Sequence, residues 1–289
     1  MLSYLLENKE VNGIRTVERF RKKFEDDPGT FMQVDRATKG ETETILFNID
    51  YEGSINKDKT AVLRVFAKVF YNHLGFFGSN LKVAMLEQYI TQQGKMDEFC
   101  RLIEEKKGKP WTEVRKAFAF NGKFIKPALA EALDISEEDA NNWFNDKSAT
   151  ELSVSQLVED INAYVSTKPA NFRLLFMVDE AGQYVGTDTD MLLNLQSLVE
   201  KIGSECRGKV WVVCTGQEAI DEIIKVRADE FSRIQARFKT RLSLSSSSVD
   251  EVIQKRILKK KPESEKMLEK VYEENDSVLR NLFSFRTDI

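Results

Sequence analysis

Histidine and cysteine are both scarce in this chain of 289 residues, which contains one histidine and three cysteines. A zinc site built on several histidines is therefore excluded. Cys100, Cys206 and Cys214 are widely spaced and lack metal-ligand spacing, which argues against a disulfide framework and favours a reducing, cytoplasmic compartment. Serine or cysteine hydrolase chemistry would depend on His73, near which no partner motif stands. Cys214 lies in an apolar stretch, so we interpret it as a small buried side chain.

Long apolar runs are also absent. No segment approaches the ~20 residues that a membrane-spanning helix requires, so we expect no membrane partner. The first residues lack the charged-then-apolar layout of a secretion signal. The formal net charge of −4 gives no global electrostatic reason to bind nucleic acid. With 42% hydrophobic and 31% charged residues, the chain has ample material for a core and a well-hydrated surface.

The most informative segment covers residues 173–180, where an apolar run ends in two adjacent carboxylates. Its sequence is Arg-Leu-Leu-Phe-Met-Val-Asp-Glu. A continuous apolar run of this kind predicts a strand that is covered on both faces of a sheet. Open α/β sheets bind their ligands just beyond the carboxyl ends of such strands. We therefore expect Asp179 and Glu180 to lie at a metal-nucleotide site.

Strand-like and helix-like segments alternate along the chain, which predicts an α/β fold with a mostly parallel sheet. The expected strands cover residues 43–50, the segment that ends in the two carboxylates, 209–215 and a short stretch near 241–244. The expected helices cover the first 28 residues, 57–73, 154–165 and 190–202. Glycines 182 and 186 indicate a loop after the carboxylates.

Two regions have a purely helical periodicity. Residues from about 75 to 150 are rich in charge and predict a helical insertion between strands, in which Ser136 and Asp139 have the spacing of a capping box. Residues 248–289 are helical and highly charged, and predict the start of a helical lid. The expected domains are therefore a core at 1–247, which includes the insertion, and the lid at 248–289.

Polar groups follow or precede three of the predicted strands. They are Asp179 and Glu180, then Thr215 and Gln217, then Arg233 and Arg237. ATP hydrolysis needs groups of these kinds. One carboxylate holds Mg²⁺, a second polarises the attacking water, a neutral polar group orients that water, and an arginine offsets the charge that develops on the phosphoryl group.

This order of motifs resembles an AAA+-type P-loop ATPase, in which a Walker B strand, sensor 1, an arginine finger, a last strand and a helical lid follow one another. The resemblance implies ATP and Mg²⁺ as cofactors, Asp179 as the Mg²⁺ ligand and Glu180 as the catalytic glutamate. It implies that Thr215 is sensor 1 and that Gln217, close to the nucleotide, is the alternative candidate for this role. Arg237 matches the arginine finger, and the arginine four residues earlier is the alternative.

A narrower resemblance rests on several segments of this sequence. They are Val-Asp-Glu-Ala-Gly-Gln-Tyr-Val-Gly at 178–186, Leu-Asn-Leu-Gln at 193–196, Lys-Val-Trp-Val-Val-Cys-Thr at 209–215, Thr-Ile-Leu-Phe-Asn-Ile-Asp at 44–50, and the block 231–244. They are similar to the large P-loop ATPase component of BREX phage-defence systems. The similarity covers about residues 40–260. It implies an ATPase that drives conformational change in a phage-resistance assembly, with other BREX proteins as partners and, if the arginine finger acts in trans, a homo-oligomer.

The phosphate-binding loop of this family, G-x-x-x-x-G-K-[ST], is absent from the 289 residues. The family is also much longer than this chain, and its loop precedes the first helix. The resemblance therefore implies an N-terminally truncated piece, in which residues 2–6 belong to the helix that follows the loop.

Each motif also has a simpler structural interpretation. An Asp-Glu pair can mark a strand that merely ends at the surface, and a threonine there can be a turn residue. Gln183 and Tyr184 either shape the loop or contact a neighbouring subunit. Asp188 and Asp190 suggest a metal site or, as we favour, a helix cap. A basic run at 255–261 suggests contact with DNA phosphates or, as we favour because acidic residues follow closely, a solvated lid face.

Two other functions share these features. The chain could be a non-catalytic module for assembly or DNA interaction that keeps the NTPase fold without using nucleotide. It could also be a regulatory switch ATPase, which has the same core. Nucleotide affinity separates the first of these from the enzyme.

The truncation hypothesis makes a prediction about the gene. The coding DNA upstream of Met1 is expected to encode, in frame, a glycine-rich loop that ends in Gly-Lys-Ser or Gly-Lys-Thr. Sequencing of the locus checks this, and a stop codon just upstream with no such loop would count against it.

Overall fold

The computed structural model describes residues 2–53, 58–146, 152–185, 188–216 and 257–282, together with positions 238, 240, 242 and 253. The chain divides into two units, Met1–Lys239 and Thr240–Ile289. In the described residues, no helix has both the length and the apolar character needed to span a membrane. The predicted boundary between core and lid, after residue 247, lies outside the described residues, and of the strand predicted near 241–244 only position 242 is described.

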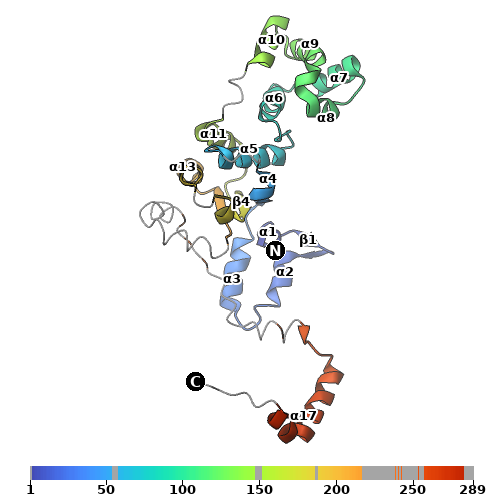
Figure 1. The fold of residues 1–289 in the computed structure, drawn as a ribbon, viewed down its shortest axis with the longest axis vertical. Helices are drawn as coiled ribbons and strands as arrows, with labels where there is room; N and C mark the ends of the chain where they lie inside the picture. Colours follow the sequence, from blue (N-terminus) through green and yellow to red (C-terminus); the bar gives the residue numbers. More distant parts are fainter. Residues whose placement is uncertain are drawn as a thin grey trace. The chain divides into compact units, whose positions relative to one another are not determined.

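A three-stranded parallel sheet lies in the first unit (Figure 1). Its strands, in spatial order, are β3 (Thr42–Asn48), β4 (Arg173–Asp179) and β5 (Val210–Cys214). Asn48 pairs with Asp179 across the first interface, and Val178 pairs with Cys214 across the second. The predicted α/β class with a parallel sheet is confirmed, and the strand that ends in the carboxylates is its central strand.

One face of the sheet carries the main hydrophobic core. Every second residue of β4 points into this core, and Phe176 lies 5.3 Å from Phe66 between ring centroids. Most of the helical residues in the core come from α5 (Ala61–His73), α11 (Val154–Ser166) and α13 (Thr189–Glu205). On the opposite face Leu46 and Trp211 are exposed, so the described residues cover that face less completely than the sequence predicts.

The predicted helix over the first 28 residues is wrong. The chain instead forms α1 (Leu2–Leu6), a hairpin of β1 (Glu10–Val11) and β2 (Ile14–Arg15), α2 (Thr16–Arg21) and, from Pro28 onward, α3 (Pro28–Ala37). The reason is the Asn12-Gly13 pair, whose φ angles of 53° and 77° make the two-residue turn that suits a tight hairpin. Asp27 then caps α3 by accepting a hydrogen bond from the Thr30 N–H at 3.0 Å.

Smaller differences concern element ends. The first predicted strand ends at Asn48, because α4 (Ile49–Glu52) begins there, and the predicted loop after the carboxylates contains the short helix α12 (Ala181–Val185). Asp188 caps α13, as its Oδ1 accepts a hydrogen bond from the Met191 N–H at 2.9 Å. The capping interpretation of Asp188 is therefore confirmed.

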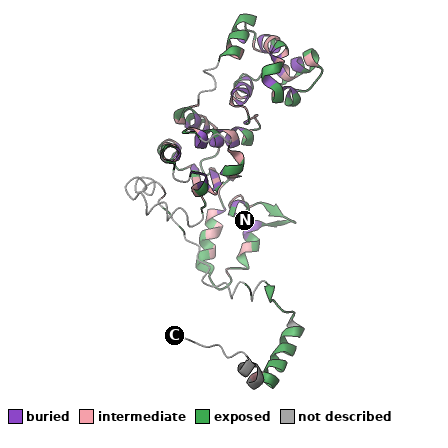
Figure 2. Cartoon of the chain, viewed as in Figure 1, coloured by how far each residue is buried: buried purple, intermediate pink, exposed green. Residues whose placement is uncertain are grey.

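The insertion between β3 and β4 has a core of its own (Figure 2). Its helices are α6 (Leu81–Gln92), α7 (Met96–Lys107), α8 (Trp111–Val114), the 3-10 helix η1 (Arg115–Asn121), α9 (Gly122–Leu133) and α10 (Glu137–Asn145). The Glu87 side chain is buried among them. It accepts hydrogen bonds from the Trp111 ring at 2.6 Å, the Arg115 guanidinium at 2.8 Å and the Phe77 N–H at 2.6 Å. Ser136 caps α10 through the Asp139 N–H, as the sequence predicts.

The second unit contains α17 (Pro262–Leu282). Its described side chains are largely exposed, and its sequence mixes lysines with glutamates. This composition suits a helix whose polar face is in water.

The Glu43 carboxylate connects the amino end of β3 with α5 and α11. Glu43 accepts hydrogen bonds from Tyr164 at 2.6 Å and Lys168 at 2.8 Å, and its other close partner is Nε2 of His73 at 2.7 Å. Burial alone would raise the pKa of Glu43, but the hydrogen bonds from Lys168, Tyr164 and His73 lower it to about 2. The only histidine of the chain thus has a structural partner, at the end of the sheet opposite to Asp179.

This arrangement makes stability depend on pH. Because the pKa of Glu43 falls from 4.5 to about 2 on folding, its contribution is present above pH 4.5 and is lost as pH falls toward 2. Glu43→Gln is expected to lower the free energy of unfolding at neutral pH by about 1–2 kcal/mol, since the carboxylate is partly exposed. Urea unfolding of the wild type and of Glu43→Gln across this pH range checks this prediction. The difference between their free energies of unfolding should disappear as the pH falls toward 2.

The matched control is Glu41→Gln, because Glu41 is exposed and belongs to the same segment. It is expected to change the free energy of unfolding by no more than about 0.5 kcal/mol at any pH. A gap between wild type and Glu43→Gln that stays constant with pH would contradict the assignment.

Candidate functional site at the carboxyl end of the sheet

Three neighbouring strand ends bring four polar residues together. Because the strands are parallel, their carboxyl ends share one edge of the sheet, where open α/β sheets bind ligands. Asn48 ends β3, Asp179 ends β4 with Glu180 directly after it, and Thr215 follows β5. We call these four residues the carboxyl-end cluster.

Thr215 is fixed to the central strand by its backbone and its side chain. Its N–H donates to the carbonyl of Val178 at 2.9 Å, and its carbonyl accepts from the N–H of Ala181 at 3.1 Å. Its hydroxyl donates a short hydrogen bond to Oδ1 of Asp179. The predicted pairing of the carboxylate strand with the Thr215 strand therefore produces a direct contact between Thr215 and the first carboxylate.

Glu180 occupies a left-handed backbone conformation, with a φ of 59°. This region is unfavourable for a non-glycine residue by about 1 kcal/mol or more, and such strain is frequent at functional sites. Two hydrogen bonds hold it in place, because its N–H donates to the Thr215 hydroxyl at 3.3 Å and its Oε2 accepts from the Asn48 amide at 2.6 Å. The turn thus directs the two carboxylates to opposite neighbours.

Asn48 is the site residue that the sequence interpretation missed. Its side-chain oxygen accepts from the N–H groups of Asp50 at 3.0 Å and Tyr51 at 3.3 Å, so it caps α4. This leaves its amide N–H₂ directed at Glu180. The signal in the sequence was a polar residue near the end of an apolar strand expected to run parallel to the carboxylate strand.

The cluster can be reached from solvent and offers oxygen ligands. Asp179 and Thr215 are exposed, whereas Glu180 and Asn48 are half-buried. Mg²⁺ prefers oxygen ligands and is commonly held by one or two carboxylates together with water and substrate phosphates. The described part of the chain contains no group of three or more His, Cys, Asp or Glu side chains that could hold a metal. The donor set around Asp179 suits a magnesium ion that takes its remaining ligands from water and phosphate.

The other predicted site residues cannot be placed beside this cluster. Gln217 and Arg237, with the alternative Arg233, lie outside the described residues. Tyr184 is buried on α12, and a Cβ at Gly53 would come within 2.6 Å of its hydroxyl, so its ring packs closely on the end of α4. Among the alternatives for Tyr184, this packing favours shaping of the local structure.

Cys214 lies one residue before Thr215. Burial raises the pKa of its thiol to about 12, which keeps the thiol protonated at neutral pH. A protonated thiol is a weak nucleophile, which agrees with the interpretation of Cys214 as a non-catalytic side chain, but the residue as a whole is half-buried and not fully buried as the sequence predicts.

No protein-family model matches the chain, and no solved structure matches it.

Proposed function

We propose that the carboxyl-end cluster is the Mg²⁺-binding and water-activating part of an ATPase site of the AAA+-like P-loop class. The observation that carries the proposal is the placement of two adjacent carboxylates at the end of a central parallel strand, each held by a different neighbouring strand. Phosphoryl transfer needs this division, because one carboxylate must serve the metal while the other acts on water.

Each residue of the cluster has a role in this proposal. Asp179 would hold Mg²⁺, and the Thr215 hydroxyl orients that carboxylate. Glu180 accepts a hydrogen bond from the attacking water and so increases its nucleophilicity. Asn48 positions the Glu180 carboxylate through its amide, which engages Oε2 and leaves the other carboxylate oxygen able to accept from water.

The biological setting of the proposal comes from the sequence resemblance. An ATPase of this kind would act in a BREX-type phage-resistance assembly, with other BREX proteins as partners and ATP hydrolysis as the source of conformational change. An arginine finger at Arg237 acting on a neighbouring subunit would make the active form a homo-oligomer.

Replacement of Glu180 tests the proposed chemistry. Glu180→Gln keeps the size of the side chain and its contact with Asn48, but removes the charge that polarises water. The rate of ATP turnover by the purified protein, expressed from its native gene, is expected to fall by about 100-fold or more. Its affinity for Mg²⁺·ATP should change little. Phosphate release and calorimetric titration measure these two quantities.

The control variant is Glu159→Gln, which removes an exposed carboxylate from α11 and should leave both quantities unchanged. Absence of Mg²⁺·ATP binding at millimolar nucleotide, in a well-folded sample, would sink the proposal.

Replacement of Asn48 tests the contact with the second carboxylate. Asn48→Asp retains a good cap for α4 but places a second carboxylate against Glu180. Two carboxylates in contact share a proton more readily, so the acidic limb of the pH–rate profile should move upward by about one pH unit. The thermal unfolding midpoint should stay nearly constant. An unchanged profile with a lowered midpoint would show that Asn48 serves only the fold.

One observation favours a second candidate function. The sequence contains no G-x-x-x-x-G-K-[ST] loop, so a module that keeps the fold for assembly or DNA interaction without nucleotide accounts for the same chain. That module would show no Mg²⁺·ATP binding and no effect of Glu180→Gln on any interaction it makes.

A further inference from the structure

Residues 106–126 of the helical insertion carry a charge opposite to that of the whole chain. They contain seven lysines and arginines and a single acidic residue, whereas the chain has a net charge of −4. The segment covers the end of α7, then α8 and η1, and the start of α9. Three of its basic residues form ion pairs, which are Lys106–Glu131, Lys109–Glu113 and Arg115–Glu87.

The other four basic residues are lysines that form no ion pair within the described part of the chain. Lys107 and Lys123 approach the same aromatic ring, with their Nζ atoms 4.5 Å and 4.8 Å from the centroid of Phe124. A cation close to an aromatic ring is attracted by the ring's negative face, so Phe124 holds both lysines in this part of the segment. Lys116 lies on η1 of the same segment and is exposed.

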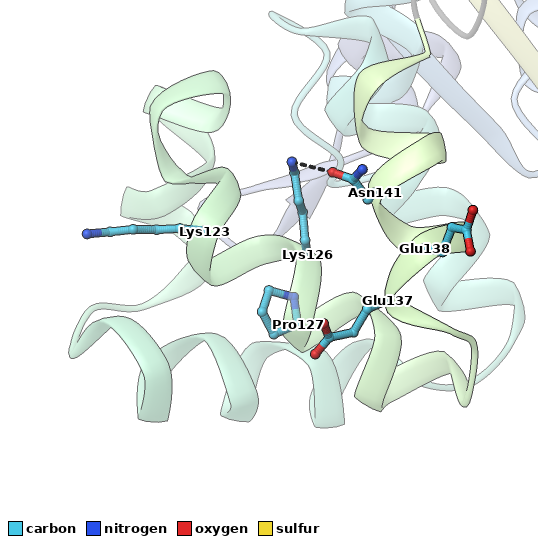
Figure 3. A pocket seen from close by; sticks show the side chains of 6 residues that line it. All are labelled: Lys123, Lys126, Pro127, Glu137, Glu138 and Asn141. Atoms are coloured by element: carbon cyan, nitrogen blue, oxygen red, sulfur yellow. Dashed lines mark hydrogen bonds between the residues drawn. The ribbon is translucent and has the colours of Figure 1, made fainter.

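Lys126, the fourth of these lysines, belongs to a neighbouring feature. It donates to Oδ1 of Asn141 at 2.6 Å and lines a pocket of about 430 Å³ with Lys123 and two glutamates. Figure 3 shows Lys126 directed at Asn141, whereas the Lys123 side chain extends to the side opposite to Glu137 and Glu138. Because the Lys126 ammonium is held by Asn141, it is less available to an anion than the other three lysines.

A solvent-exposed aromatic residue lies within the same segment. Phe120 is 91% exposed, whereas Phe118 in the same turn is 6% exposed and stacks on Phe144 at 4.7 Å between centroids. The turn has a non-helical residue at Ala117, with φ −119° and ψ 45°. The backbone thus buries Phe118 and exposes Phe120 to water. Packing of the core involves only Phe118, so it does not account for the exposed ring.

We propose that Lys107, Lys116, Phe120, Lys123 and Phe124 form a basic–aromatic surface that binds single-stranded nucleic acid. Unpaired lysines supply the attraction for phosphates, and an exposed aromatic ring supplies a platform on which an unpaired base can stack. A duplex offers phosphates but keeps its bases stacked internally, so it would use the lysines and not Phe120. This inference stands independently of the proposed ATPase function.

Fluorescence anisotropy with the full chain and a labelled oligothymidylate of about 20 nucleotides tests the proposal. Affinity should fall as salt rises from about 50 to 200 mM. Lys107→Gln combined with Lys123→Gln should weaken binding about tenfold and reduce the slope of log affinity against log salt by about 1. The control pair Lys39→Gln and Lys201→Gln removes the same charge from ion-paired lysines elsewhere and should change neither quantity.

Phe120→Ala separates single-stranded nucleic acid from other polyanions. It should weaken oligothymidylate binding by about tenfold and leave binding of a matched duplex and of heparin unchanged. Circular dichroism should show an intact fold, because the ring makes little contact in the structure. Tyr51→Ala, at an 85% exposed aromatic residue outside the insertion, is the matched control and should have no effect.

Three outcomes would overturn the proposal. The first is absence of oligothymidylate binding by the wild-type chain at low salt. The second is equal weakening by the control lysine pair, which would indicate attraction without a defined surface. The third is lysine-dependent binding of heparin, duplex or an acidic peptide with no dependence on Phe120, which would indicate a general polyanion or acidic-protein surface.

Discussion

The register of β4 between β3 and β5 is the constraint on which the candidate site depends. Because Asn48 pairs with Asp179 and Val178 pairs with Cys214, the three strand ends lie side by side. A slip of one residue would exchange the two faces of the strand and carry Asp179 away from its partners. Burial of Leu174, Phe176 and Val178 on the helix-covered face opposes such a slip, so core packing fixes the position of the carboxylates.

The turn at Glu180 converts two adjacent residues of like charge into groups with different partners. An extended continuation of β4 would place the second carboxylate on the opposite face of the sheet. The left-handed conformation keeps it at the edge, where the Asn48 amide donates to the carboxylate and the Thr215 hydroxyl accepts from the Glu180 backbone N–H. The cost of the conformation is therefore offset by hydrogen bonds that only this geometry allows, which is the pattern expected of a functional turn.

In the helical insertion, one buried carboxylate determines which of the nearby basic residues is paired. Glu87 is buried, forms an ion pair with Arg115 and accepts a hydrogen bond from the Trp111 ring N–H, so its charge is balanced without any of the lysines. Lys107, which is half-buried, and the exposed Lys123 then form no ion pair within the described residues. The overall charge of the chain does not reveal this, since acidic residues elsewhere outweigh the basic segment.

Several features follow from the sequence alone, because their causes are local. The apolar run before Asp179 determines a buried strand, and Ser136 and Asp188 determine helix starts through hydrogen bonds that span three residues. The Asn12-Gly13 pair is equally local, and the error in the first 28 residues came from giving helical periodicity priority over that turn signal.

The contents of the site were decided only by the tertiary structure. Asn48 lies 132 residues from Glu180, and Thr215 lies 36 residues from Asp179, so their contacts exist only once the strands pair. The sequence suggested Thr215 because it ends an apolar strand, but it could not assign Asn48 to Glu180 or show that Glu180 has a positive φ. Local preference determines which segments become strands, whereas long-range pairing, stabilised by burial of the whole core, determines which strand ends meet.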